Sequence, residues 1–288
     1  MCRLVFVGGE GQDMYRKEMS EAAAAVRAAK TLVITAGAGM GVDSGLPDFR
    51  GAQGFWRAYP MYQHLGIDFI DAANPVHFEN DPAFGWGFYG HRTQLYRKTE
   101  PHAGFSLLRN WVERYGMQAF VVTSNVDGQF QKAGFAADGV LEVHGSIHHL
   151  QCTVPCCNRI WDNDQDMTVD YATMRAQDYP HCPHCGAVAR PNILMFGDYS
   201  WISERSARQQ QRFDSFLARA EAPVVVVELG AGTAIPTIRH LSERLVRGDG
   251  GKLIRINPRE SQVPSGQIPL AMGALEGLER IEMALQEA

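Results

Sequence analysis

The chain reads Gly37-Ala38-Gly39-Met40-Gly41-Val42-Asp43-Ser44-Gly45-Leu46-Pro47-Asp48-Phe49-Arg50 directly after the apolar run Thr31-Leu32-Val33-Ile34-Thr35. A strand that ends in clustered glycines lets backbone N–H groups approach a diphosphate, which is typical of nucleotide sites. Phosphate binding alone would not need the carboxylate, aromatic ring and guanidinium that follow in Asp48, Phe49 and Arg50. The stretch therefore predicts a strand and a nucleotide-binding loop at which a reaction takes place.

The composition of the chain is that of a globular protein. Its 288 residues are 45% hydrophobic and 20% charged, and no apolar stretch reaches the roughly 18 residues of a membrane helix. The net charge is −5 without any run of like charge, which argues against a nucleic-acid arm or a membrane patch. The apolar stretch at the N-terminus is too short for a signal peptide. We expect a cytoplasmic protein with no membrane partner and no direct nucleic-acid partner.

Four short apolar runs rich in β-branched residues predict buried parallel strands. They lie at 32–35, 120–123, 224–227 and 253–256. Helical stretches precede them at 18–30, 103–114, 213–220 and 237–247. This alternation favours an α/β fold with a Rossmann-like, doubly wound parallel sheet. Small and polar residues follow every run, so we expect them to line one crevice at the carboxyl ends of the strands.

Two stretches interrupt the alternation and predict a second, smaller domain that is helical and zinc-binding. The first is rich in aromatic residues, and the second holds five of the six cysteines. We place the Rossmann-like domain at 1–50 with 102–149 and 196–288, and the small domain at 51–101 with 150–195.

The cysteines form two knuckles with the spacing of a structural zinc site. Our first choice of ligands is Cys152, Cys156, Cys182 and Cys185. Cys157 could replace Cys156, and His181 or His184 could compete. Buried reduced cysteines without a metal are the alternative. Because no pair of histidines with a glutamate accompanies the cysteines, a structural ion is favoured over a catalytic one.

Polar residues that could carry a reaction follow two further apolar runs. Thr123-Ser124-Asn125-Val126-Asp127 follows the second strand, and Glu142-Val143-His144-Gly145-Ser146 comes shortly after. His144 is the side chain here with a proton affinity near neutrality, so it is the candidate general base. Asn125, Asp127 and Asp48 occupy strand ends of the same predicted crevice.

Together these motifs resemble the sirtuin family over residues 31–278. The resemblance is carried by the glycine loop with Pro-Asp-Phe-Arg, Thr-x-Asn-Val-Asp, His-Gly-Ser, the paired cysteines and Met195-Phe196-Gly197-Asp198. It implies that NAD is a co-substrate, that one structural zinc ion is bound, and that the partner is an acylated lysine of a protein. The implied products are the free lysine, nicotinamide and O-acyl-ADP-ribose.

The resemblance also implies a role for each matched residue. Gly37, Ala38 and Gly39 would hold the diphosphate, Phe49 would screen the nicotinamide position, and Asp48 and Arg50 would order the loop. Asn125 and Asp127 would hold the ribose and the carboxamide, and His144 would deprotonate a ribose hydroxyl. The remaining implied NAD contacts are Ser124, Gly232, Thr233, Asn257 and Ala274. Phe196 and Gly197 resemble the strand that pairs with the substrate backbone.

Three positions in the implied NAD pocket depart from the family pattern. Gly41 and Ala234 stand where serine is usual, and Ser124 stands where glutamine is usual. Serine cannot reach as far as glutamine, so the ribose contact would be lost or bridged by water.

Tyr89 and Arg92 match the Tyr-x-x-Arg of sirtuins that prefer malonyl, succinyl or glutaryl lysine. A spacing of three places both side chains on one helical face, where the guanidinium could bind an acyl carboxylate. A solvated Arg92 beside a core tyrosine is the alternative.

The hypothesis is an NAD-dependent protein-lysine deacylase with a preference for succinyl or malonyl groups. One alternative is an NAD glycohydrolase or a protein ADP-ribosyltransferase, in which water or a protein side chain intercepts the activated ribose. The other is a non-catalytic NAD-sensing module.

Overall fold

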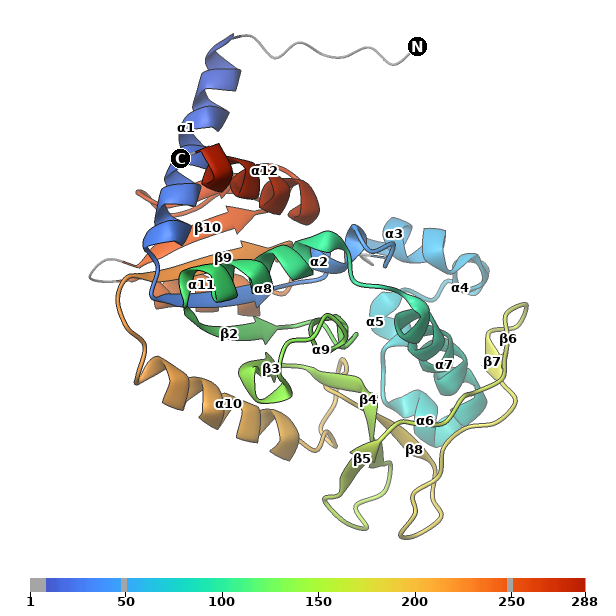
Figure 1. The fold of residues 1–288 in the computed structure, drawn as a ribbon. Helices are drawn as coiled ribbons and strands as arrows, with labels where there is room; N and C mark the ends of the chain where they lie inside the picture. Colours follow the sequence, from blue (N-terminus) through green and yellow to red (C-terminus); the bar gives the residue numbers. More distant parts are fainter. Residues whose placement is uncertain (1–8, 48–50, 248–250, 288) are drawn as a thin grey trace. The chain divides into compact units, whose positions relative to one another are not determined.

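The structure is a computed structural model that describes residues 9–47, 51–247 and 251–287 (Figure 1). Side-chain surroundings are described from Tyr15 onward within these ranges, and from Gln53 after the first gap. The chain divides into two compact units. Unit 1 comprises residues 1–43, 102–121 and 216–288, and unit 2 comprises residues 44–101 and 122–215. The domain boundaries that we predict from the sequence remain a prediction.

A six-stranded sheet in the order β11-β10-β9-β1-β2-β3 organises the α/β part of the fold. Its strands are β1 (Thr31–Ala36), β2 (Gln118–Thr123), β3 (Val140–Glu142), β9 (Val224–Leu229), β10 (Lys252–Ile256) and β11 (Ile268–Leu270). β1 pairs in parallel with β9, β9 with β10, and β10 with β11. Every residue of β1 is buried, as expected of a central parallel strand.

The helices of unit 1 are α1 (Gly9–Ala28), α2 (Gly39–Val42), α8 (Ala103–Tyr115), α11 (Thr237–Leu245) and α12 (Ala274–Glu287). α12 packs against α1 and α8, and α11 packs against β9 and β1. Capping residues define both ends of α8. The His102 side chain accepts a hydrogen bond from the Gly104 N–H at its start, and Gly116 ends it in the left-handed region at φ 59°.

The order of strands reverses between β1 and β9. From β1 the chain proceeds to β2 and β3 on one side, whereas β9, β10 and β11 follow one another on the other side. Such a reversal is where open α/β sheets bind ligands, beyond the carboxyl ends of the strands. Gly37 follows β1 and Gly230 follows β9, so both glycine turns lie at this point of the sheet.

The first part of unit 2 is helical. It contains α3 (Gly51–Ala58), α4 (Pro60–His64), α5 (Phe69–Ala72), α6 (Val76–Asn80) and the long α7 (Pro82–Lys98). Its core is a cluster of aromatic side chains, most of them buried. Ring centroids within this cluster lie between 5.1 and 6.3 Å apart, for instance in the pairs Phe88–Tyr89 and Phe69–Phe88. Most of these rings meet edge to face, the arrangement that aromatic quadrupoles favour.

The rest of unit 2 is built around a three-stranded antiparallel sheet. It consists of β4 (Gly145–Cys152), β5 (Ile160–Asp162) and β8 (Ala189–Ile193) in the order β5-β4-β8. A short hairpin of β6 (Val169–Asp170) and β7 (Arg175–Ala176) packs on α7. The remaining elements are α9 (Gln129–Lys132), the 3-10 turn η1 (Ala137–Gly139) and α10 (Glu204–Leu217), whose last residues belong to unit 1.

The predicted fold class is confirmed: the four apolar runs are β1, β2, β9 and β10. Two helices differ clearly from their expected bounds: α1 covers Gly9–Ala28 rather than 18–30, and α10 covers Glu204–Leu217 rather than 213–220. The first turns of α10 are almost wholly polar and bury only Ser206 and Gln209, so they carry little apolar periodicity. Within the described ranges, no helix combines the length and the apolar character needed to cross a bilayer.

Candidate active site and metal centre

The turns after β1 and β9 approach each other so closely that only glycine fits. A Cβ on Gly39 would lie 2.6 Å from the Cα of Gly230, and one on Gly37 would lie 2.8 Å from the Cα of Ala231. Gly230 also has φ +59°, which favours glycine. The N–H groups of Gly37 and Gly39 donate to Leu229 and Gly230 carbonyls at 2.9 and 3.0 Å. These two glycines therefore join the turns to each other, and their role toward a diphosphate remains a prediction.

The neighbouring positions of this loop differ in exposure. Ala38 is exposed, whereas Gly41 is buried inside the short helix α2. A serine at position 41 would therefore need a partner for a buried hydroxyl, which glycine avoids. Asp48, Phe49 and Arg50 lie outside the described residues.

Asn257, after β10, organises the loops of unit 1 from a fully buried position. Its amide nitrogen donates to the Ala231 carbonyl at 2.9 Å, and its Oδ1 accepts from the N–H groups of Arg259 and Glu260 at 3.1 and 3.0 Å. Glu260 in turn accepts hydrogen bonds from the hydroxyl and the N–H of Thr233. Asn257 thus fixes the strand ends on which the implied adenosine contacts lie.

The other implied contacts of unit 1 flank this network. Gly232 is half-buried and Ala234 is exposed. Ala274 is buried at the start of α12, where the Leu275 N–H donates to the Asp43 carboxylate at 2.8 Å. The carboxylate of Glu260 was missed by sequence reasoning, because nothing in Asn-Pro-Arg-Glu marks its contact with Thr233.

In unit 2 the structure brings His144 to the end of β2. The imidazole of His144 is hydrogen-bonded to the backbone of Ser124. The His144 carbonyl accepts from the Leu194 N–H at 2.9 Å. Gly145 turns the chain directly behind it at φ +79°, where a Cβ would lie 2.0 Å from the Asn192 carbonyl oxygen. His-Gly-Ser therefore needs its glycine for steric reasons.

Burial lowers the pKa of His144, and the hydrogen bond to Ser124 opposes this shift only in part. The imidazole is consequently neutral near pH 7, the state that a general base requires. Ser124 and Asn125 are half-buried, and the Asn125 N–H donates to the Thr123 hydroxyl at 3.0 Å.

Asp127 is buried on the same loop. Its Oδ1 accepts from the Gln129 N–H at 2.9 Å, and its carbonyl is hydrogen-bonded to the Nε2 of His148 at 2.9 Å. Burial raises the pKa of Asp127 to about 6, against the lowering effect of the Gln129 N–H and of Arg92. The carboxylate is thus held in a site where its charge is costly.

Tyr89 and Arg92 are both buried on α7. The guanidinium of Arg92 donates from Nε and from Nη2 to the hydroxyl oxygen of Tyr96, at 3.0 and 2.7 Å. Arg92 is therefore not the solvated surface residue of the alternative interpretation. Sequence reasoning missed Tyr96, although its spacing of four from Arg92 on one helix was a usable signal.

The segment after β8 forms a turn rather than the strand that the family resemblance implies. β8 ends at Ile193, and the half-buried Phe196 and the exposed Gly197 lie in the turn, with Gly197 at φ +66°. The Asp198 carboxylate closes this turn by accepting from the Met195 N–H at 3.2 Å, and its buried ion pair with Arg190 at 2.8 Å anchors it. The chain forms a turn here instead of a strand, because Gly197 has a positive φ and the Asp198 side chain bonds to the nearby backbone.

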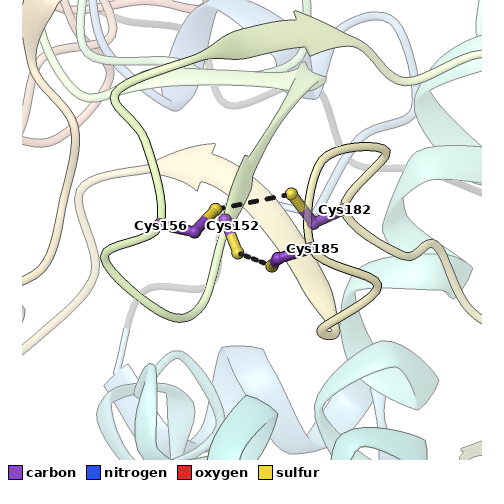
Figure 2. Close-up of side chains that lie close together, drawn as sticks. All are labelled: Cys152, Cys156, Cys182 and Cys185. Carbon is purple, nitrogen blue, oxygen red and sulfur yellow. Dashed lines mark hydrogen bonds between the residues drawn. The ribbon is translucent and has the colours of Figure 1, made fainter.

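The two cysteine knuckles converge because β4 pairs with β8 (Figure 2). Cys152 ends β4 opposite Ala189, and Cys182 and Cys185 lie on the turn that leads into β8. Their sulfur atoms meet in two pairs. Cys152 and Cys185 are 3.6 Å apart, and Cys156 and Cys182 are 3.7 Å apart.

This donor set fits a tetrahedral zinc ion, since structural zinc sites commonly use four thiolates. Burial opposes ionisation of Cys182, but the N–H groups of Cys185 and His184 donate to its thiol and lower its pKa to about 7. A second group of Cys156, Cys157 and His184 shares Cys156 with the first. Only the four-cysteine group supplies a complete tetrahedron among the described residues. It contains Cys156 and not Cys157, as in our first choice of ligands.

The fold and this cluster define the class: a Rossmann-like nucleotide-binding protein with a four-cysteine module. A family model described as the Sir2 family matches residues 37–221, more than half of the chain. The chain belongs to the Sir2 family.

Individual relatives agree with this membership. An NAD-dependent protein deacylase of Thermococcus kodakarensis is 30% identical over 245 residues, which cover 85% of this chain and 86% of the relative. An NAD-dependent protein deacetylase of Saccharolobus solfataricus is 31% identical over 231 residues, covering 80% and 81%. The solved structure of a Sir2 homologue in complex with NAD superposes with a TM-score of 0.71 at 25% identity, covering 93% of this chain and 94% of the other.

Proposed function

We propose that this protein removes acyl groups from lysine side chains of proteins with NAD as co-substrate, and that His144 is the general base. The observation that carries the proposal is the placement of His144, half-buried, bonded to the Ser124 backbone and neutral near pH 7, in a chain of the Sir2 family. Relatives named NAD-dependent protein deacylases and deacetylases support the same reaction.

The residues present fit NAD and zinc. The glycine turns after β1 and β9 lie at the reversal of the sheet, where open α/β sheets bind ligands, and the four thiolates match the ligands that zinc prefers. Bound NAD would supply an ADP-ribose group to the acyl oxygen, with nicotinamide as the leaving group. His144 would accept the proton of a ribose hydroxyl, whose oxygen then bonds to the acyl carbon, and a water molecule would complete the release of the lysine amine. Asn125 and Asp127 hold the ribose and the carboxamide, and zinc stabilises the fold around β4 and β8.

The proposed acyl group carries a carboxylate, as in succinyl or malonyl lysine. The support is the buried guanidinium of Arg92, which lies among aromatic rings with Tyr89 on the preceding turn of α7. An acetyl group offers no charge to such a cation, whereas a carboxylate gains a charge-assisted hydrogen bond. Phe196 and Gly197 contact the substrate backbone in this proposal.

The role of His144 is tested by nicotinamide release in the presence of NAD and a succinyl-lysine peptide. His144→Ala removes the base, so we expect a loss of about 100-fold or more in rate with unchanged zinc content. His240→Ala, at an exposed position of α11, is the matched control and should keep the wild-type rate. A His144→Ala variant that releases nicotinamide at the wild-type rate would refute the proposed role.

A further inference from the structure

Cys157 follows Cys156 directly in the chain but lies outside the four-cysteine group. Cys157 is half-buried, and its sulfur atom lies 3.6 Å from that of Cys156. The sulfur of Cys156 lies at nearly the same distance, 3.7 Å, from that of Cys182 on the other knuckle (Figure 2). Cys156 therefore has one close sulfur neighbour inside the group and another outside it.

Both of these distances match the edge of a zinc–thiolate tetrahedron. Zinc binds thiolate sulfur at about 2.3 Å, so two sulfur ligands of one tetrahedral ion lie about 3.8 Å apart. Neighbouring side chains of an extended chain point in opposite directions. Here the chain bends, and the Cys156 N–H donates to the Val154 carbonyl at 2.7 Å. The first knuckle thus holds the sulfurs of Cys156 and Cys157 at the separation that one shared ion requires.

His184, from the second knuckle, supplies a third donor. It lies on a turn that Gly186 closes at φ +75°, with an N–H bond to the Cys182 carbonyl at 2.9 Å. One ring nitrogen of His184 and the sulfurs of Cys156 and Cys157 all lie within 4.8 Å of one another. The His184 side chain is exposed, so its ring can move closer to an ion without disturbing the core.

The charge of the four-cysteine site favours a second cation beside it. Four thiolates carry four negative charges, of which one Zn²⁺ cancels two. Backbone N–H groups bond to the sulfurs of Cys152 and Cys182 and stabilise their thiolates. The hydrogen-bonding contacts of the Cys156 sulfur, by contrast, are all with other sulfur atoms. A thiolate keeps free lone pairs after it has bound one ion, so Cys156 can bind a second.

We propose that Cys156, Cys157 and His184 bind a second zinc ion, with the sulfur of Cys156 shared between the two ions. Zinc prefers thiolate and imidazole donors, and three protein ligands leave the fourth position of the tetrahedron to water. Cys157 gives up its thiol proton to solvent as the ion binds. This ion exchanges more readily than the first, because His184 is exposed whereas Cys152 and Cys182 are buried. The proposal does not depend on the reaction with NAD.

The second site is tested by equilibrium dialysis of the reduced protein against a slight excess of free zinc, with bound zinc measured by mass spectrometry. We expect two bound ions per wild-type chain, and one for Cys157→Ser and for His184→Asn. His181→Asn is the matched control and should keep both ions. His181 is an exposed histidine of the same knuckle whose ring is bonded to the Gly186 carbonyl at 3.1 Å.

Two results of the dialysis would overturn the proposal. One is that Cys157→Ser and His184→Asn bind as much zinc as the wild type. The other is that His181→Asn loses as much zinc as they do.

Cadmium-113 NMR tests the shared sulfur on the wild-type protein alone, so the result does not depend on whether a variant folds. Cadmium is the probe because soft thiolate sites accept it in place of zinc. We expect two resonances that are split by coupling between the two ions through the Cys156 sulfur. A single resonance, or two resonances without mutual splitting, would overturn the proposal.

Discussion

Two buried arginines, Arg255 in unit 1 and Arg92 in unit 2, are held in different ways. Arg255 on β10 donates to both carboxylate oxygens of Glu228, at 2.5 and 2.9 Å, and to Glu243 at 3.1 Å. Arg92 donates twice to the neutral hydroxyl of Tyr96 and lies among aromatic rings. Carboxylates of its own chain neutralise Arg255, whereas a phenol oxygen and aromatic rings position Arg92.

The register of the sheet explains why Arg255 pairs with Glu228. Arg255 lies directly opposite Glu228 across the β9–β10 pair, and both side chains are fully buried. A pair fixed in this way locks two strands together but cannot respond to a substrate. The aromatic cluster around Arg92 instead offers a rigid frame in which a cation keeps its direction.

The largest expected effect comes from breaking the Arg255 pair. Arg255→Met leaves the buried Glu228 carboxylate with only the more distant Arg239, at 4.0 Å, which should cost about 3–5 kcal/mol of unfolding free energy. Urea unfolding followed by circular dichroism measures the loss. Arg280→Met, which breaks a half-exposed pair with Glu276 on α12, should cost under about 1 kcal/mol. Equal losses in the two variants would show that Arg255 is not held by charge.

The Asp127→Asn variant tests whether Asp127 serves as the counter-ion of Arg92, as Glu228 does for Arg255. Burial raises the folded-state pKa of Asp127 to about 6 from 3.8, so the folded state binds this proton more tightly than the unfolded state. This group therefore lowers stability as the pH rises from about 4 to about 6. The variant should be up to about 3 kcal/mol more stable than the wild type above that window and similar below it.

Urea unfolding at a series of pH values measures this difference, with Asp214→Asn at an exposed position of α10 as control. A variant that is less stable than the wild type at neutral pH would show instead that Asp127 serves as the counter-ion of Arg92.

Arg92→Met should cost less stability than Arg255→Met, the equivalent change at the other buried arginine. The aromatic cluster can accept an apolar side chain, and the loss of the bond to Tyr96 should cost about 1–2 kcal/mol. Activity should respond far more strongly, with kcat/KM for a succinyl peptide falling about 100-fold and that for an acetyl peptide falling much less. A large loss of stability, or equal losses of kcat/KM with both peptides, would show that Arg92 has a structural role, as Arg255 does.

Much of this architecture could be predicted from the sequence, because apolar runs and cysteine spacing are local patterns. The four strand runs and the two cysteine knuckles needed no information from distant residues, whereas the spacing left Cys156 and Cys157 as alternatives. The sequence also singles out the glycines of the first loop, whose predicted contact with a diphosphate stays a prediction. Their close approach to Gly230 depends on strand order, which no local pattern contains.

Contacts that depend on register could not be predicted. Glu228 and Arg255 face each other only because β9 and β10 pair in one particular register. The expected strand at Phe196 becomes a turn because Asp198 reaches back to the Met195 N–H and is anchored by Arg190. The hydrogen bond of Arg92 to Tyr96 depends less on distant residues. The spacing of four residues on one helix is visible in the sequence, and only the direction of the two side chains could not be predicted from it.

The most direct test of the account is the identity of the product that wild-type protein forms from NAD and a succinyl-lysine peptide, determined by mass spectrometry. We predict O-succinyl-ADP-ribose and nicotinamide in equal amounts, formed only when the peptide is present. ADP-ribose formed at the same rate without any peptide would contradict the account.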